Sequence, residues 1–85
     1  MVISRNAEMR TLEVQYQEFQ TMAGRRKEWV VLGQRGTLAK SKKKKQAVKD
    51  ARDRAKHLAK KLNQSVEVKI YRKDGSWQEE NVYKP

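Results

Sequence analysis

Residues 42–62 read KKKKQAVKDARDRAKHLAKKL, and this stretch carries the clearest periodicity of the 85-residue chain. Its apolar side chains recur at three- and four-residue intervals, which places them on one face at about 100° per residue. The members of this stripe are Ala47, Val48, Ala51, Ala55, Leu58, Ala59 and Leu62. The pattern predicts an amphipathic helix over 42–62, with Ser41 as its N-cap and Asn63 as a left-handed stop. Four alanines in the stripe allow the helix to lie close against a sheet.

The residues after this helix alternate between apolar and charged side chains, as a half-buried strand does. Val66, Val68 and Ile70 supply the apolar side, and Asp74-Gly75 predicts a hairpin turn before a returning strand over 77–83. A three-residue loop places Tyr71 opposite Trp77, Lys69 opposite Glu79 and Val66 opposite Val82. A two-residue loop shifts this register by one residue, and the sequence does not decide between the two registers.

The residues before the helix predict a second hairpin. Residues 11–22 alternate as a strand does, although a helical spacing is also present and leaves helix as the alternative. Residues 24–27, Gly-Arg-Arg-Lys, are typical of a hairpin loop, and residues 29–32 form a short apolar strand. Gly33 and Gly36 then open a polar loop.

Together these elements predict an α+β fold with the order β-β-α-β-β. We expect two layers, a four-stranded antiparallel sheet with the amphipathic helix packed on one face. Residues 1–10 are polar without a strong period and predict a flexible N-terminal arm, and residues 11–85 predict a single domain.

The amino-acid composition excludes several kinds of functional site. The chain has no cysteine, which excludes disulfides, a thiolate nucleophile and a cysteine-containing zinc site. It also shows no apolar leader and no apolar run of the roughly 20 residues that span a bilayer. A hydrophobic content of 36% allows one modest core but no deep catalytic cavity beside it. We therefore expect a cytoplasmic protein.

The positive charge is concentrated in one part of the sequence. Residues 35–61 contain twelve Lys or Arg against two Asp, which accounts for ten of the eleven net positive charges. Such a localised charge favours a polyanionic partner. Lysines also fill the predicted first turn of the helix, where the helix dipole disfavours cations by roughly 0.3–1 kcal/mol each. A bound phosphate would offset this repulsion.

The candidate nucleic-acid-binding residues follow from this charge map. Five cations lie along one flank of the predicted helix over a rise of about 22 Å, a length that matches several backbone phosphates. The set, with its extension through the N-terminal turn and the preceding loop, is Arg35, Lys40, Lys42, Lys43, Lys44, Lys45, Lys49, Arg52, Lys56 and Lys60. A secondary basic contact is predicted at the hairpin tip from Arg25, Arg26 and Lys27. A solvated, solubilising lysine surface is the alternative interpretation.

Other functions have less support in the sequence. His57 is the only histidine and Glu79-Glu80 point to opposite faces of a strand, so we expect no metal site, no cofactor and no enzymatic activity. The predicted function is binding to DNA or RNA through phosphates. A protein partner or a homodimer formed through a sheet edge is the alternative. The alanine-rich apolar side of the helix argues against membrane binding.

The order of these motifs resembles a family of short bacterial and archaeal proteins called domain of unknown function 2188. The shared features are Trp29-Val30-Val31, an Ala-rich helix opened by Lys45-Gln46-Ala47-Val48, and the hairpin Arg72-Lys73-Asp74-Gly75 followed by Gln78-Glu79-Glu80. The family usually has a small aliphatic residue where Trp77 stands. The resemblance covers residues 12–83 and implies the β-β-α-β-β order, but no activity and no catalytic residue.

Overall fold

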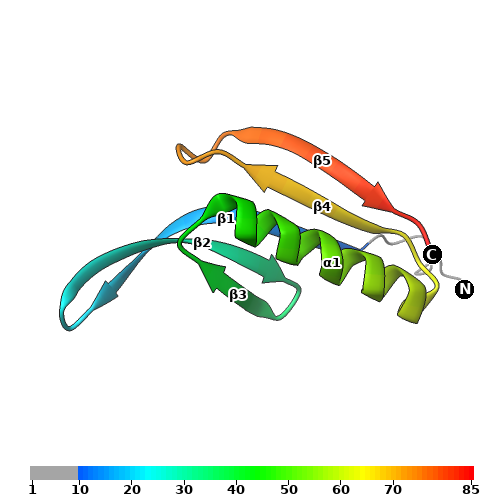
Figure 1. The fold of residues 1–85 in the computed structure, drawn as a ribbon, viewed down its shortest axis with the longest axis horizontal. Coiled ribbons are helices and arrows are strands. Elements are labelled where there is room, and N and C mark those ends of the chain that lie inside the picture. Colours follow the sequence, from blue (N-terminus) through cyan, green and yellow to red (C-terminus); the bar gives the residue numbers. More distant parts are fainter. Residues whose placement is uncertain (1–9) are drawn as a thin grey trace, which may run out of the picture.

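The computed structural model describes residues 10–85, which form one sheet and one helix in the order β-β-β-α-β-β (Figure 1). The elements are β1 (Arg10–Thr21), β2 (Gly24–Gly33), β3 (Gly36–Ser41), α1 (Lys44–Leu62), β4 (Val66–Tyr71) and β5 (Trp77–Tyr83). The predicted α+β class is confirmed. The predicted arm lies outside the described residues except for Arg10, which is the first residue of β1.

The sheet differs from the prediction in strand number and direction. Its five strands lie in the spatial order β3-β2-β1-β4-β5, and β1 pairs with β4 in parallel while the other neighbours are antiparallel. The prediction of a four-stranded antiparallel sheet is therefore wrong. The prediction lacked β3, and this omission explains both the wrong strand number and the wrong strand direction, because each hairpin reverses the chain. With β3 present, α1 runs back across the sheet and β4 enters in the same direction as β1.

Strand β3 occupies the segment that was predicted to be a polar loop. Gly33 and Gly36 pair across the two-residue turn Gln34-Arg35, which joins β2 to β3. Gly36 has φ of +121°, a conformation that other residues rarely adopt. A register shift between Val31 and Leu32 leaves one extra residue in this short edge strand.

The hairpin of β1 and β2 is longer than expected. Residues 11–21 are strand rather than helix, and the turn lies at Met22 and Ala23. The predicted loop over 24–27 is therefore wrong, because these residues belong to β2 and pair with residues 18–21. The hairpin tip projects beyond the N-terminal end of α1 (Figure 1) and lengthens the molecule to 51 Å against 26 and 23 Å.

The core lies between α1 and the sheet. Ala47, Ala51, Ala55 and Ala59 are fully or almost fully buried, as the stripe predicted. They pack against alternating residues of the inner strands: Leu12, Val14, Trp29, Val31, Val66, Val68 and Ile70. Because alanine has a short side chain, the helix backbone approaches the sheet closely, and the strands supply the larger side chains.

The C-terminal end of α1 is as predicted, but its N-terminal end is not. Asn63 has the left-handed conformation that was expected, with φ of 54° and ψ of 43°. The helix begins at Lys44 instead of Lys42, with Lys43 at the N-cap position. Ser41 is not the cap. It ends β3, and its Oγ accepts a hydrogen bond from the backbone N–H of Lys43 at 3.2 Å.

The last hairpin has the predicted turn and a mixed register. Tyr71 pairs with Trp77, as the three-residue loop requires. A register shift next to this pair then places Lys69 opposite Glu80 and Val66 opposite Tyr83, so those two predicted pairs are wrong. Gln78 is the extra residue of the bulge, and it turns Glu79 toward α1.

Candidate nucleic-acid interface

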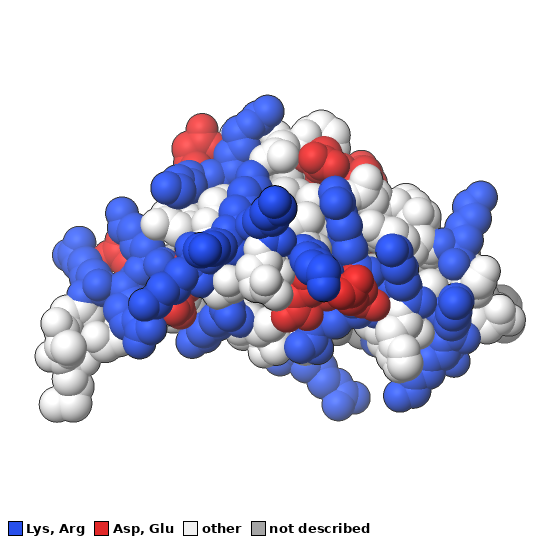
Figure 2. Space-filling model, in the orientation of Figure 1, with Lys and Arg blue, Asp and Glu red and all other residues white. Residues whose placement is uncertain are grey.

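The face that carries α1 has many more basic than acidic side chains. Figure 2 shows Lys and Arg side chains spread across this face among uncharged ones, with acidic side chains in a few small groups. The predicted flank of the helix faces β5, because Arg52 contacts Glu79 and Lys56 lies near Tyr83. The structure therefore brings Lys45, Lys49, Arg52, Lys56 and Lys60 onto one side of the helix, as the periodicity indicated.

The N-terminal turn of α1 contains the densest group of exposed cations. Lys42, Lys43 and Lys45 are exposed, and no ion pair joins any of them to an acidic side chain of residues 10–85. No Asp or Glu lies in this turn, all of which the structure describes. Its free backbone N–H groups and these lysines form one positively charged end of the helix.

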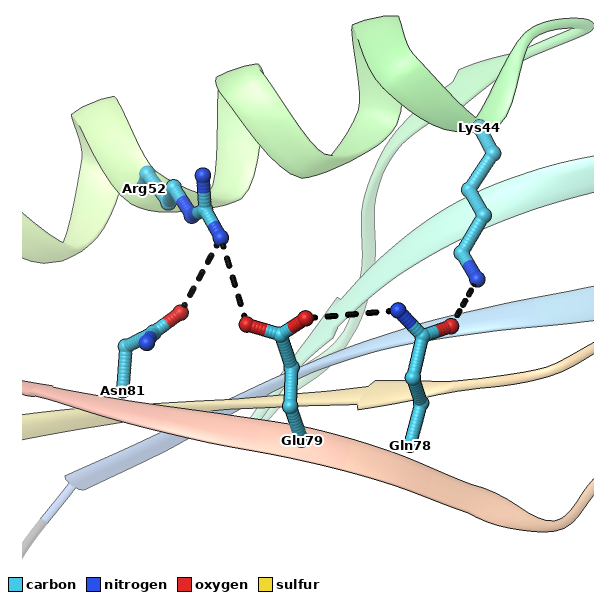
Figure 3. A network of polar contacts seen from close by, with 5 residues as sticks. All are labelled: Lys44, Arg52, Gln78, Glu79 and Asn81. Atoms are coloured by element: carbon cyan, nitrogen blue, oxygen red, sulfur yellow. Dashed lines mark hydrogen bonds and ion pairs between the residues drawn. The ribbon is translucent and has the colours of Figure 1, made fainter.

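Lys44 has a structural role that the charge map did not reveal. It is half-buried, and its Nζ lies 5.0 Å from the centroid of the Trp29 ring. The same Nζ donates a short hydrogen bond to Oε1 of Gln78 on β5 (Figure 3). Lys44 therefore ties the start of α1 to the sheet, which limits its reach toward a ligand.

Arg52 interrupts the row at its middle. Its Nη2 donates to Oδ1 of Asn81 at 3.2 Å and lies 3.5 Å from Oε2 of Glu79 (Figure 3). Its Nε is buried and has no hydrogen-bond partner among residues 10–85. The carboxylate of β5 thus masks part of the charge that the sequence assigned to a ligand surface.

The other members of the row remain on the surface. Lys49 pairs with Asp53 at 3.8 Å, an exposed contact of little energetic value. Lys56 and Lys60 are exposed, and the Nζ of Lys56 lies 5.8 Å from the centroid of the Tyr83 ring. Accessible cations therefore lie on both sides of Arg52 along α1.

The loop residues that were expected to extend the row lie elsewhere. Arg35 lies in the β2–β3 turn, beside a depression of about 450 Å³ that Arg10 and Leu58 also line. Lys40 follows Ala39, which packs against the core, so Lys40 points to the opposite face of the sheet. There its Nζ lies 4.2 Å from the centroid of the Phe19 ring.

The secondary contact at the hairpin is largely neutralised. Arg25 pairs with Glu18 at 3.3 Å, Lys27 approaches the same carboxylate at 4.0 Å, and Arg26 pairs with Glu28 at 3.2 Å. These three cations alternate along β2, so they point to both faces of the hairpin instead of forming one patch.

Sequence reasoning missed a hollow near the N-terminal end of α1. It is lined by side chains from three separate segments: Tyr16, Glu18, Lys27, Lys73 and Asp74. The Nζ of Lys73 lies 5.2 Å from the centroid of the Tyr16 ring. No local pattern could have shown this site, because it depends on the pairing of β1 with both β2 and β4.

No group of three or more His, Asp or Glu side chains within residues 10–85 could hold a metal ion. On the opposite sheet face, a hydrogen bond with Glu67 raises the pKa of Glu80, and partial desolvation adds to the effect. In the same range, no helix is long and apolar enough to cross a membrane.

The comparison with protein families identifies the chain. It belongs to the family described as "Uncharacterized protein conserved in bacteria (DUF2188)", whose model matches residues 19–83. This confirms the resemblance seen in the sequence. The match begins within β1 and ends with β5. The comparisons with curated proteins and with solved structures found no match.

Proposed function

We propose that this protein binds nucleic acid through the phosphate backbone and has no enzymatic activity. The observation that carries the proposal is the N-terminal end of α1, where Lys45 and the two residues just before the helix, Lys42 and Lys43, are exposed. Cations at this end of a helix oppose the helix dipole, so this arrangement lowers stability. A phosphate bound there would accept hydrogen bonds from the free N–H groups and neutralise the lysines together.

The rest of the helix supports contact with more than one phosphate. Lys49, Lys56 and Lys60 lie on the side of α1 that faces β5, all with exposed side chains. The distance along the axis from Lys45 to Lys60 is about 22 Å, which is several times the spacing of phosphates along one strand. A polyanion that follows the helix could therefore contact lysines on both sides of Arg52.

The test compares two variants with the same loss of charge. Lys42→Gln/Lys43→Gln removes cations of the proposed site, and Lys61→Gln/Lys84→Gln removes two outside it. Binding of fluorescent DNA and RNA oligonucleotides is measured by anisotropy between about 50 and 200 mM salt. We expect the first variant to make the plot of log K against log salt less steep by about two for a duplex. The control variant should change it less.

Two results would contradict the proposal. One is the absence of binding to any oligonucleotide at about 50 mM salt, where phosphate contacts are strong. The other is an equal loss of affinity in the two variants, because this would indicate general charge attraction without a defined surface.

A second candidate function is association with a protein through the outer edge of β5. This strand ends the sheet, and Trp77 and Val82 are 53% and 46% exposed. A partner strand could pair with the free backbone groups of β5 and cover these side chains. Light scattering between micromolar and millimolar concentration, repeated with Trp77→Ser, tests self-association at this edge. A monomer throughout would exclude a homodimer.

A further inference from the structure

The hollow beside α1 combines an aromatic floor with charged walls. It is lined by Tyr16 of β1, by Glu18 and Lys27 of the β1–β2 hairpin, and by Lys73 and Asp74 of the β4–β5 turn. Its volume is about 500 Å³, enough for a flat heterocycle with its sugar. It is adjacent to the proposed phosphate site, because the Trp29 ring packs at a tilt of 46° against Tyr16 and also lies beneath Lys44.

The Tyr16 ring is held in place from one side. Its centroid lies 4.9 Å from that of Trp29, which is almost fully buried in the core. Tyr16 itself is half-buried, and Lys73 is exposed with its Nζ 5.2 Å above the ring. A lysine ammonium over an aromatic face interacts only weakly at an exposed site, so a ligand can displace it. The Tyr16 ring is thus fixed by Trp29, while the Lys73 side chain over it can move away.

The charged side chains that line the hollow can interact with the groups of a nucleotide. Lys27 and Lys73 can pair with a phosphate, while the carboxylates of Glu18 and Asp74 can accept hydrogen bonds from base N–H groups. Hydrogen bonds from the side chain and the backbone of Ser76 lower the pKa of Asp74, so this carboxylate is ionised at neutral pH.

We propose that this hollow stacks one unpaired nucleobase on Tyr16, and that the preferred ligand is therefore single-stranded nucleic acid. The inference rests on the proposed function, because the lysines of the α1 N-terminal turn would hold the adjoining phosphates. In an intact duplex both faces of a base are already stacked, so the Tyr16 ring cannot reach them. Base stacking on an aromatic side chain is tolerant of sequence, and the same ring can accept different bases.

The test is a cycle of two proteins and two ligands. The full chain and its Tyr16→Leu variant are titrated with a short oligothymidylate and with an abasic strand of the same length and charge. We expect the wild-type protein to bind the oligothymidylate about tenfold more tightly than the abasic strand. Tyr16→Leu should bind the two strands equally, and its affinity for the abasic strand should match that of the wild type.

Two controls separate stacking from damage to the fold. Tyr16→Phe keeps the ring and should keep the preference for bases. Thermal unfolding followed by circular dichroism shows whether Tyr16→Leu remains folded at the temperature of the titration. If it does not, Asp74→Asn, which replaces an exposed carboxylate argued to accept hydrogen bonds from base N–H groups, is titrated instead and should reduce the preference for bases.

The outcomes distinguish this inference from the proposed function. Equal binding of both strands by the wild-type protein would overturn the base-stacking site and leave phosphate binding intact. An unchanged preference in Tyr16→Leu would also overturn it, because the bases would then be bound elsewhere. Absence of binding to both strands and to a duplex at about 50 mM salt would overturn both.

Discussion

Arg52 and Glu79 control how much of the helix surface is free to bind an anion. The guanidinium lies at the middle of the basic row, and the carboxylate of β5 lies 3.5 Å from it. Both side chains are partly exposed, at 40% and 44%, so the pair contributes about 0–1 kcal/mol to stability. A phosphate would therefore compete with Glu79 for Arg52 at a small energetic cost to the fold.

Replacing this carboxylate should strengthen nucleic-acid binding. In Glu79→Gln the new amide oxygen can still accept a hydrogen bond from Arg52, but the charge that opposes a phosphate is gone. We expect affinity for an oligonucleotide to rise about fivefold at about 50 mM salt, with salt dependence steeper by about one. Anisotropy titrations at several salt concentrations measure both quantities.

Glu80→Gln is the matched control for this prediction. It removes the same charge from the neighbouring residue of β5, which interacts with Glu67 on the other face of the sheet. General attraction by net charge predicts the same gain in both variants. If Glu80→Gln increases the affinity as much as Glu79→Gln, Arg52 takes no specific part in binding.

At the scale of single elements, α1 shows how much the sequence could predict. A helix of period 3.6 repeats its apolar positions many times, so Ala47 to Leu62 identify the element, its buried face and its basic flank. The N-terminal boundary was placed two residues early because Ser41 is a favourable cap by composition. In the structure, pairing of Ser41 with Trp29 keeps it in β3 instead.

Strand β3 shows where such reasoning fails. Gly36 to Ser41 contain a single large apolar residue, Leu38, and it occupies the bulge instead of a regular inward position. A short edge strand gains its stability from pairing with β2, which a local pattern does not report. The position of the basic flank was predictable. The masking of Arg52 and the hollow under Lys73 were not, because both depend on contacts between segments that are distant in the sequence.

The N-cap of α1 should be a place where stability can be increased at the expense of binding. Lys43 has the extended conformation of a cap, with φ of −112° and ψ of 131°, but its side chain makes no capping hydrogen bond. Lys43→Ser supplies a hydroxyl acceptor and removes a cation from the positive end of the helix dipole. We expect the free energy of unfolding to rise by about 1 kcal/mol, measured by urea denaturation.

Lys61→Ser provides the comparison at the opposite end of α1. Lys61 lies in the last turn, where a cation interacts favourably with the helix dipole. This change should lower stability by about 0.5 kcal/mol, because serine also forms helix less readily than lysine. A loss of stability in Lys43→Ser would show that Lys43 makes a stabilising contact and would remove the argument that its position is functional.

At the scale of the whole molecule, the charge on the surface opposes the fold. The net charge is +11 on 85 residues, and the described ion pairs are exposed or partly exposed. Salt weakens these pairs, but each contributes only about 0–1 kcal/mol. Salt also screens the repulsion among the excess cations. At low ionic strength this repulsion extends across the helix face, because the Debye length is about 30 Å at 0.01 M.

Repulsion should dominate, so the protein should become more stable as salt is added. We expect the Tm to rise by several degrees as potassium chloride increases from about 0.01 to 0.3 M, since the Debye length then falls below the width of the helix surface. Lys42→Gln/Lys43→Gln should start from a higher Tm and gain less, because the repulsion at the N-terminal turn is already reduced. Differential scanning calorimetry measures the Tm of both proteins. A Tm that is independent of salt, or an equal gain in both proteins, would mean that these lysines are not crowded enough to lower stability and that a phosphate would relieve no strain there.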